Sequence, residues 1–288
     1  MLDFQQPTRE DAQYFPTSSD YSLSYNVFHS FTEIWGDVID ITIARTKTAL
    51  YTRLRGGKRF LLPYTENLEA AMAELEAHCK ESGDSFIVES VTTEDAMKLQ
   101  QLGYTIERNR DLDEYLYTSE KLIKLSGRKL QSKRNHISQF ERKYTYSIRS
   151  MSKKEIREEC YTMASTTWIE NKDEMNDDIK EELQALRNAL DKWDELKLVG
   201  MIICIDHHLS AFTIGEVIDE NLAIIHFEKG DTHYAGVYPV INQLFCSQYL
   251  GDITYINRQE DAGVAGLRKA KKSYRPDLMV EKYRVTRT

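Results

Sequence analysis

Residues Lys197–Glu228 read KLVGMIICIDHHLSAFTIGEVIDENLAIIHFE, and they give the clearest indication of the fold class. It contains three runs rich in the residue types that favour β-strands: Lys197–Ile205, Leu209–Ile218 and Leu222–Glu228. The residues between the runs are turn formers, DHH after the first and DEN after the second. The stretch therefore predicts three consecutive strands joined by tight turns, the antiparallel part of a larger sheet.

The flanking sequence adds helices and further strands to this meander. Helices are predicted where apolar residues recur at intervals of three or four, as in Ile179, Leu183, Leu186 and Leu190. In chain order, the second half is predicted to contain a strand at Tyr144–Ser150, helices at Lys153–Thr166 and Asp177–Trp193, the meander, a helix at Val237–Leu250, a strand at Ile253–Asn257, a helix at Val264–Lys272 and a strand at Leu278–Val285. The helix that follows the meander can cross over the sheet, which allows the next strand to lie parallel to the last strand of the meander.

The first half repeats this order in a shorter form. Its predicted elements are strands at Asp40–Thr46, Ala49–Arg55 and Arg59–Pro63, a helix at Glu66–Ser82, a strand at Ser85–Glu89, a helix at Thr93–Leu102 and a strand at Tyr104–Glu107. Both halves therefore read β-β-β-α-β-α-β, an order typical of GNAT-type acyltransferases. We predict an α/β chain, with mixed sheets of the α+β kind, made of two tandem GNAT-like domains at 1–118 and 144–288. A basic linking helix at 119–143 joins them.

Composition excludes several classes of protein. The chain has 288 residues and a mean hydropathy of −0.54. Its longest apolar run, Val199–Ile205, is far shorter than the roughly 20 residues of a membrane helix. The N-terminus shows no secretion leader, the sequence has no CxxC, HxxxH or GxSxG motif, and it has no phosphate-binding P-loop. The four cysteines are scattered: Cys79, Cys160, Cys204 and Cys246. We therefore expect a soluble, cytoplasmic protein with no metal site, no disulfide framework and no transmembrane segment.

Charge is distributed unevenly along the chain. The formal net charge is −8. The segment from Lys121 to Arg157 contains twelve lysines and arginines but only two acidic residues. The segment from Arg268 to Arg287 contains eight lysines and arginines and two acidic residues. Two basic islands in an acidic chain favour a local site for a polyanion, because salt limits the range of charge to about 8–10 Å. The alternative for each island is a solvated helix face.

Two motifs within and beside these islands carry a family resemblance. Asp113–Tyr117 (DEYLY) with Leu125–His136 (LSGRKLQSKRNH), and Asn257–Pro276 (NRQEDAGVAGLRKAKKSYRP), resemble the soluble catalytic region of phosphatidylglycerol lysyltransferases and their stand-alone relatives. The similarity extends over nearly the whole chain and includes the aromatic stretch Tyr25–Trp35. It implies a dual GNAT fold and transfer of an aminoacyl group from charged tRNA to a lipid head group. Lipid-modifying members carry a large membrane region that this sequence lacks, so the acceptor stays open.

The donor is predicted from the loop that binds pyrophosphate in acetyl-CoA-dependent GNAT proteins, where glycines let backbone amides approach the phosphates. The corresponding segment here, His233–Pro239, keeps one glycine but has Tyr238 in place of a small residue and Pro239 in place of an amide donor. The first half has Pro63–Glu66 there, with an acid where phosphate would lie. This favours aminoacyl-tRNA over acyl-CoA as donor, with acyl-CoA or another phosphate-bearing acyl carrier as the alternative.

The first basic island lies on a predicted helix, Leu125–Phe140. Lysine binds phosphate as a point charge and arginine as a fork, so this surface suits a nucleic-acid backbone. The candidate binding residues of the segment are Arg128, Lys129, Lys133, Arg134 and Asn135. The alternative is a helix that only links two acidic domains.

The second candidate group follows the predicted strand Ile253–Asn257. Ligands of open α/β sheets collect at the carboxyl ends of strands, which favours polar residues at this edge. Asn257 is suited to orient a carbonyl group and Arg258 to bind a phosphate or a carboxylate. The candidates of this group are Asn257, Arg258, Arg268, Lys271 and Tyr274.

Acyl transfer also needs a group that takes the proton of the nucleophile. Glu228, which follows His226 by two positions on one strand face, and Asp231 at the strand's end are the hypothetical bases. The alternative is that these acids belong to an ordinary turn. Trp168 is the candidate that lines the acceptor pocket, and a core position is its alternative.

The sequence therefore predicts an aminoacyltransferase that uses charged tRNA without a resident cofactor or metal and makes peripheral contact with lipid head groups. Two other functions remain open. One is an N-acyltransferase that uses acyl-CoA or an acyl carrier. The other is a pair of GNAT domains without catalysis that binds a polyanion or a protein.

Overall fold

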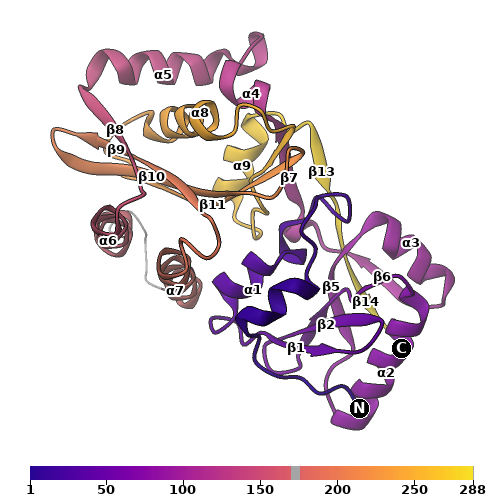
Figure 1. Cartoon of the computed structure of the whole chain (residues 1–288). Helices are drawn as coiled ribbons and strands as arrows, with labels where there is room; N and C mark the ends of the chain where they lie inside the picture. Colours follow the sequence, from indigo (N-terminus) through magenta and orange to yellow (C-terminus); the bar gives the residue numbers. More distant parts are fainter. Residues whose placement is uncertain (170–175, 288) are drawn as a thin grey trace. The chain divides into compact units, whose positions relative to one another are not determined.

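The computed structural model describes residues 1–169 and 176–287, and it leaves out the side chain of Trp168 (Figure 1). By their contacts the residues form two compact units, and each of them is built from separate parts of the chain. The first unit comprises Met1–Glu114, Glu260–Arg268 and Met279–Thr288. The second comprises Tyr115–Gln259 and Lys269–Leu278.

The first unit contains a mixed sheet in the order β1-β2-β3-β5-β14-β6, with β4 paired to β2. The bounds of these strands are β1 Thr42–Arg45, β2 Ala49–Leu54, β3 Arg59–Leu61, β4 Tyr64–Thr65, β5 Ile87–Thr92, β6 Thr105–Arg108 and β14 Lys282–Thr286. The pairs β1–β2 and β2–β3 are antiparallel, whereas β3 and β5 are parallel, with Phe60 opposite Val88. β14 is antiparallel to both of its neighbours.

Helices α2 (Leu68–Ser82) and α3 (Thr93–Gln101) supply much of the core of this unit. α2 buries Met72 and Leu75 completely, together with Phe60 of the sheet. The start of α2 follows from local chemistry, because the side chain of Asn67, the residue before the helix, accepts a hydrogen bond from the amide of Ala70. The remaining helical segments of the unit are η1 Arg9–Tyr14, η2 Tyr25–Val27, α1 His29–Trp35 and η3 Arg110–Leu112.

The second unit contains the predicted meander, which is confirmed. Its sheet has the order β13-β7-β12-β11-β10-β9-β8. The bounds are β7 Glu114–Thr118, β8 Tyr146–Ser150, β9 Val199–Ile205, β10 His208–Val217, β11 Leu222–Gly230, β12 Tyr255–Asn257 and β13 Leu278–Val280. β8 to β11 are antiparallel, β12 is parallel to β11, and β7 is antiparallel to β12.

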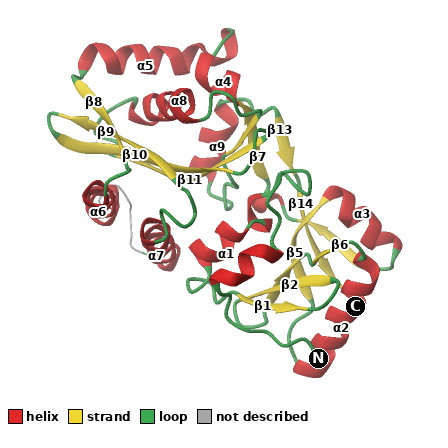
Figure 2. Ribbon diagram, viewed as in Figure 1, coloured by secondary structure: helices red, strands yellow, loops and turns green. Residues whose placement is uncertain are grey.

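Helices cover both faces of this second sheet (Figure 2). α8 (Val237–Tyr249) packs on β9, β10 and β11 and carries α5 (Gln131–Lys143) on its outer side, while α6 (Lys154–Met163) and α7 (Asp177–Asp191) lie on the opposite face. The core is apolar on both faces, because the consecutive residues Ile202 and Ile203 of β9, which point to opposite faces of the sheet, are both fully buried. The other helical segments are α4 Ser119–Lys124, η4 Arg128–Leu130 and a π-helical turn at Ala164–Trp168. Helix α9 (Ala265–Ser273) is divided between the units, because its residues up to Arg268 belong to the first unit and those from Lys269 to the second.

Two expectations about the strands need correction. The predicted strand Leu278–Val285 is divided: β13 joins the second sheet, whereas β14 lies between β5 and β6 in the first sheet. The sequence reading also missed β7, which comes from the end of the first half and joins the second sheet. In each sheet, the strand next to the parallel pair therefore comes from the other half of the chain.

The basic segment at 119–143 also differs from the single helix expected over Leu125–Phe140. It contains α4, η4 and α5, and by its contacts it belongs to the second unit. The chain leaves α4 through Leu125, with φ +47°, and passes Gly127, with φ +86°. Because only glycine adopts such left-handed conformations readily, Gly127 allows the break before η4.

Candidate functional site

The candidate site lies in the second unit, where the parallel strands β11 and β12 separate. Their register pairs Ile224 with Asn257, and Arg258 follows directly on β12. Beyond this point the side chains of Glu228 and Arg258 meet, with 2.8 Å between Nη2 of the arginine and Oε1 of the glutamate. Both side chains are about nine-tenths buried, with exposed fractions of 11% and 12%. The pair therefore lies at the carboxyl edge of the sheet, where open α/β sheets bind ligands.

Arg258 is held as a buried cation. Burial opposes its charge, but the Glu228 carboxylate and the phenol groups of Tyr274 and Tyr117 outweigh this cost and raise its pKa. Its second terminal nitrogen, Nη1, is buried and has no hydrogen-bond partner among the described residues. Since an unsatisfied buried donor is costly, this nitrogen is suited to a ligand oxygen.

Asn242, on the buried side of α8, completes the environment of Glu228. Its Nδ2 donates to Oε2 of Glu228 at 3.1 Å, so the carboxylate accepts from both Arg258 and Asn242. Oδ1 of Asn242 is a second buried atom without a hydrogen-bond partner in the described part of the chain. Two donors hold Glu228 in place, an arrangement that suits positioning of Arg258 better than proton abstraction.

Lys133 of α5 brings a second cation to the same place. Its Nζ lies 4.1 Å from the centre of the Tyr274 ring, and Cζ of Arg258 lies 4.9 Å from the same ring centre. Burial and the nearby Arg258 lower the pKa of Lys133 to about 8, against the opposing effect of Glu228. Two cations beside one aromatic ring are suited to an anion, because each disfavours the charge of the other and a negative charge would relieve this repulsion.

Lys271 of α9 supports the main chain of this site. Its Nζ donates to the carbonyl oxygen of Arg258 at 2.6 Å and lies 5.9 Å from the ring centre of Tyr115. The hydroxyl of Tyr117 donates to the carbonyl oxygen of Lys271 at 2.7 Å. The site therefore gathers five of the candidate residues from the sequence: Lys133, Glu228, Arg258, Lys271 and Tyr274.

The other candidates from the basic segment lie elsewhere. Arg134 donates to the carbonyl oxygens of Leu125 and Gly127, so it holds the break between the helices. Asn135 accepts a hydrogen bond from Gln131 on the exposed surface of α5. Arg128 and Lys129 are exposed in η4.

Asn257 and Asp231 both shape turns. The buried side chain of Asn257 accepts from the amide of Gln259 at 2.7 Å, directly after β12. Oδ1 of Asp231 accepts from the amide of His233 at 2.9 Å and lies 2.7 Å from the Nδ1 of the same histidine. The neighbouring His226 pairs with Glu216, with 2.9 Å between its Nε2 and Oε2 of the glutamate. It therefore does not pair with Glu228 or Asp231, the two hypothetical bases.

Two further candidates, Arg268 and Trp168, are not among the described residues that form this site. Arg268 belongs to the first unit, where its guanidinium pairs with Asp261 and Asp111. Trp168 ends the π-helical turn, and its side chain lies outside the described residues.

The sequence interpretation missed Asn242 and Tyr117. A signal for Asn242 was present, because this amide interrupts the apolar run VYPVINQLF of α8. A polar residue on a buried helix face needs a partner, which pointed to a buried polar group in the adjacent sheet.

Neither a metal site nor a membrane helix is found in the described residues. No group of three or more His, Cys, Asp or Glu side chains at 1–169 and 176–287 is placed to hold a metal ion. Within the same residues, every helix is too short or too polar to cross a lipid bilayer.

Solved structures resemble this chain over most of its length. A conserved protein of unknown function from Bacteroides thetaiotaomicron is 27% identical, with a TM-score of 0.89 over 99% of each chain. L-PGS from Bacillus licheniformis is 16% identical, with a TM-score of 0.62 over 88% of this chain and 86% of that one. A tandem GNAT protein from the clavulanic acid biosynthesis pathway is 6% identical, with a TM-score of 0.53 over 99% and 98%. These likenesses establish the tandem GNAT fold.

Sequence comparison identifies the family. An uncharacterised protein of Mycoplasmoides gallisepticum is 27% identical over 173 residues, which are 59% of this chain and just over half, 55%, of that relative. Residues 18–286 match the family described as "Phosphatidylglycerol lysyltransferase, C-terminal". The resemblance seen in the two motifs is therefore confirmed, and the chain belongs to the phosphatidylglycerol lysyltransferase C-terminal domain family.

Proposed function

We propose that this protein transfers an aminoacyl group from a charged tRNA to a lipid head group or another small acceptor. Membership of the phosphatidylglycerol lysyltransferase C-terminal family supports this class of reaction. The modified phosphate loop at His233–Pro239 supports a donor other than acetyl-CoA. The proposal includes a cytoplasmic location, because charged tRNA is a cytoplasmic substrate.

The observation that carries the proposal is the cation pair Lys133 and Arg258 on the ring of Tyr274. The reaction develops negative charge on the ester carbonyl oxygen, and the tRNA brings phosphates close to that ester. Buried cations in a site of low dielectric constant stabilise both kinds of negative charge strongly. Nη1 of Arg258, which has no hydrogen-bond partner within 1–169 and 176–287, is the donor that we assign to the oxyanion.

The proposed steps use only groups of this site and the two substrates. The acceptor amine or hydroxyl attacks the ester carbonyl carbon, and the bond between that carbon and the ribose oxygen then breaks. Because the pKa of Lys133 is about 8, a fraction of the molecules carries it as a neutral amine near physiological pH, and in this form it takes the proton of the nucleophile. The ammonium ion that results lies beside the developing negative charge together with Arg258. The proton then passes to the departing ribose oxygen. Glu228 keeps Arg258 in position, and Asp231 has no part in these steps.

The direct test is incubation of the purified protein with radiolabelled aminoacyl-tRNA and a cell extract that supplies lipids and small acceptors. We expect label in a new product, and we expect Lys133→Met to lower the rate about 100-fold, the scale of losing one charge-stabilising group. Arg258→Lys keeps the charge but loses the fork, and it should also lower the rate. Lys154→Gln, an exposed lysine of α6, is the matched control and should leave the rate unchanged.

Two results would contradict the proposal. One is turnover with acetyl-CoA alone, which would select the acyl-CoA alternative. The other is equal activity of Lys133→Met and Lys154→Gln. Binding of tRNA adds a cheaper measurement, because a site for phosphates must lose affinity as salt is raised.

A further inference from the structure

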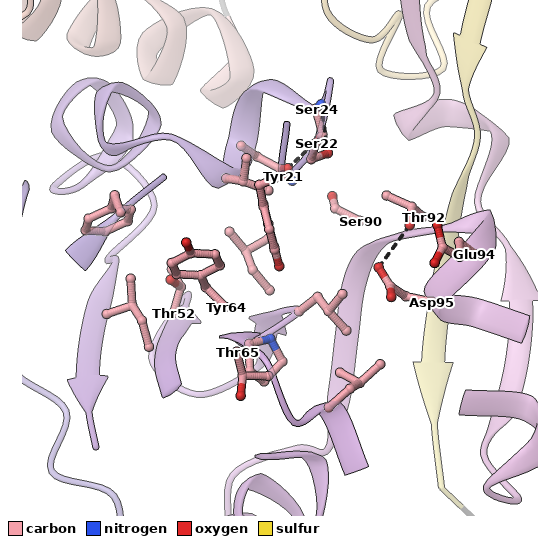
Figure 3. A pocket seen from close by; sticks show the side chains of 18 of the residues that line it. Tyr21, Ser22, Ser24, Thr52, Tyr64, Thr65, Ser90, Thr92, Glu94 and Asp95 are labelled. Atoms are coloured by element: carbon pink, nitrogen blue, oxygen red, sulfur yellow. Dashed lines mark hydrogen bonds between the residues drawn. The ribbon is translucent and has the colours of Figure 1, made fainter. Parts of the chain in front are cut away.

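The first unit contains a cavity of about 280 Å³ that the proposed function does not use. It lies where the parallel strands β3 and β5 separate, and all of its lining residues belong to this unit. Figure 3 shows the side chains of Tyr21, Tyr64, Ser90 and Thr92 gathered around it. Volumes of roughly 300–1,000 Å³ are typical of small-molecule sites, so this cavity is suited to a small ligand.

The topology of the first sheet opens the cavity. β3 and β5 pair at Phe60–Val88 and Leu61–Glu89, after which β3 leads through Pro63 to β4, which pairs with β2 instead. β5 continues through Ser90, a residue with φ +59°. A left-handed conformation in a non-glycine strand residue is strained, and such strain collects at functional sites.

Hydroxyl groups and aromatic rings form much of the lining. Tyr21 and Tyr64 meet edge to face with 4.5 Å between ring centres. The side chains with hydroxyl groups are Tyr21, Ser22, Ser24, Thr52, Tyr64, Thr65, Ser90 and Thr92. Hydroxyl groups both donate and accept hydrogen bonds, so they can accept from an N–H donor, and ring faces attract cations; this lining therefore admits a ligand with N–H donors and a positive charge.

Charge in the lining points the same way. Among the described residues, the lining contains three carboxylates, Glu66, Glu94 and Asp95, one lysine, Lys98, and no arginine. Nζ of Lys98 lies 2.8 Å from Oε1 of Glu94 and 3.3 Å from Oδ1 of Asp95, so a single ammonium group forms ion pairs with both carboxylates. The lining therefore carries a net negative charge.

The two helices that start beside the cavity do not convert it into a phosphate site. At the start of α2 the amide of Ala70 already donates a hydrogen bond to the Asn67 side chain, so it is not available to a ligand. The carboxylate of Glu66, just before this helix, also lines the cavity. The first turn of α3 carries Glu94 and Asp95. Acids at a helix N-terminus offset its partial positive charge, which removes the usual attraction for an anion.

We propose that this cavity binds a small organic cation, a primary ammonium group on an alkyl or aryl body. The ammonium group hydrogen-bonds to the carboxylate and hydroxyl oxygens, and the body packs against the apolar part of the lining, which includes Phe15, Leu50 and Leu62. The proposal goes beyond acyl transfer: it concerns a cavity in the first unit, and its test needs no tRNA.

The test compares three probes of equal size by NMR titration of the whole chain: butylammonium chloride, butanol and sodium butyrate. We expect butylammonium to bind most tightly and butyrate most weakly, and we expect added salt to weaken the binding of butylammonium. Asp95→Asn and the more exposed Glu66→Gln should each weaken butylammonium about 3- to 10-fold, the scale of one partly screened charge. Glu81→Gln, an exposed acid at the far end of α2, is the matched control and should change nothing.

The Glu66→Gln variant keeps the test informative if Asp95→Asn fails to fold. Asp95 accepts a hydrogen bond from Thr92 at the start of α3, whereas Glu66 makes no hydrogen bond or ion pair with the described residues. The proposal is overturned if butyrate binds as tightly as butylammonium, if neither acid variant differs from Glu81→Gln, or if none of the three probes shows saturable binding. Each of these results leaves the acyl-transfer proposal untouched, since that reaction is measured with a different substrate at Lys133 and Arg258.

Discussion

The two units of this chain share a sheet plan but differ in the chemistry at the same edge. In both, an antiparallel meander is followed by a parallel strand, and the parallel pair separates at its carboxyl end. In the second unit, Arg258, Lys133 and Glu228 fill that position with buried charge. In the first unit, the position is a cavity lined by hydroxyls and carboxylates. One sheet plan therefore carries different side-chain chemistry at the same edge in the two units, as expected when function resides in sites rather than folds.

The largest predicted effect tests how the first unit is held together. Lys282 of β14 is fully buried, with 2.8 Å between its Nζ and Oε1 of Glu114, and it donates to Ser24. Lys282→Ala leaves the Glu114 carboxylate buried without this cation, which should cost about 3–5 kcal/mol of unfolding free energy. Urea denaturation measures this loss.

The control for this prediction is Lys80→Ala, whose exposed pair with Glu76 should contribute less than about 1 kcal/mol. If both variants lose the same small amount of unfolding free energy, the buried ion pair between Lys282 of β14 and Glu114 does not stabilise the first unit as predicted.

The second prediction concerns how α5 is placed in the second unit. Gly236 caps α8 with φ +93°, and a Cβ atom there would lie 2.8 Å from the carbonyl oxygen of His136 on α5. Gly236→Ala should therefore cost about 2–3 kcal/mol of stability through strain and overpacking. It should also lower the transfer rate, because α5 carries Lys133.

Gly103 in the first unit gives the matched control for strain alone. Its φ is +87°, but a Cβ atom there would meet nothing within 4 Å. Gly103→Ala should cost only about 1 kcal/mol, from the left-handed conformation. Equal losses in the two variants, measured by thermal or chemical unfolding, would show that contact with α5 is unimportant.

The smallest effect is a pH dependence from Lys133. Its pKa falls from 10.5 to about 8 on folding, so between these values the unfolded chain binds more protons than the folded one. The unfolding free energy should therefore rise with pH across this window, by about 1–2 kcal/mol once partial exposure is allowed for. Denaturation at pH 8 and pH 10 measures the rise, and Lys133→Met should lack that contribution. A rise of the same size in Lys133→Met would assign it to other groups.

The sequence was sufficient for those elements that local chemistry determines. The meander followed from strand-forming runs bounded by DHH and DEN, and α2, α7 and α8 followed from apolar spacing. The sequence analysis did not predict the strand β7 (EYLYT), and it placed the residues of β14 (KYRVT) in the second domain, because no local pattern of such a short strand tells which sheet it joins. Which sheet a short strand joins depends on contacts that are distant in sequence, and no local pattern reports them.

The candidate site could be predicted only in part, because the sequence indicates which residues are basic but not which of them are buried together. Charge and the family motif pointed to Lys133 and Arg258, but they pointed equally to Arg134 and Arg268. Only burial and partners separate them: Arg134 holds backbone carbonyls and Arg268 pairs with acids of the first unit, while Nη1 of Arg258 stays without a partner among the described residues. Solvent exposure of a basic side chain is a tertiary property, so counting charges could not supply it.

The placement of β14 has a consequence for biosynthesis. The first unit needs Lys282–Thr286 between β5 and β6, although the ribosome makes these residues only after the whole second unit. The amino-terminal half therefore cannot mature as it emerges, as leading domains generally do, and must wait as an incomplete sheet with open strand edges. Expressing that half alone should yield an aggregation-prone fragment, and supplying the missing strand as a separate peptide is the rational way to rescue it.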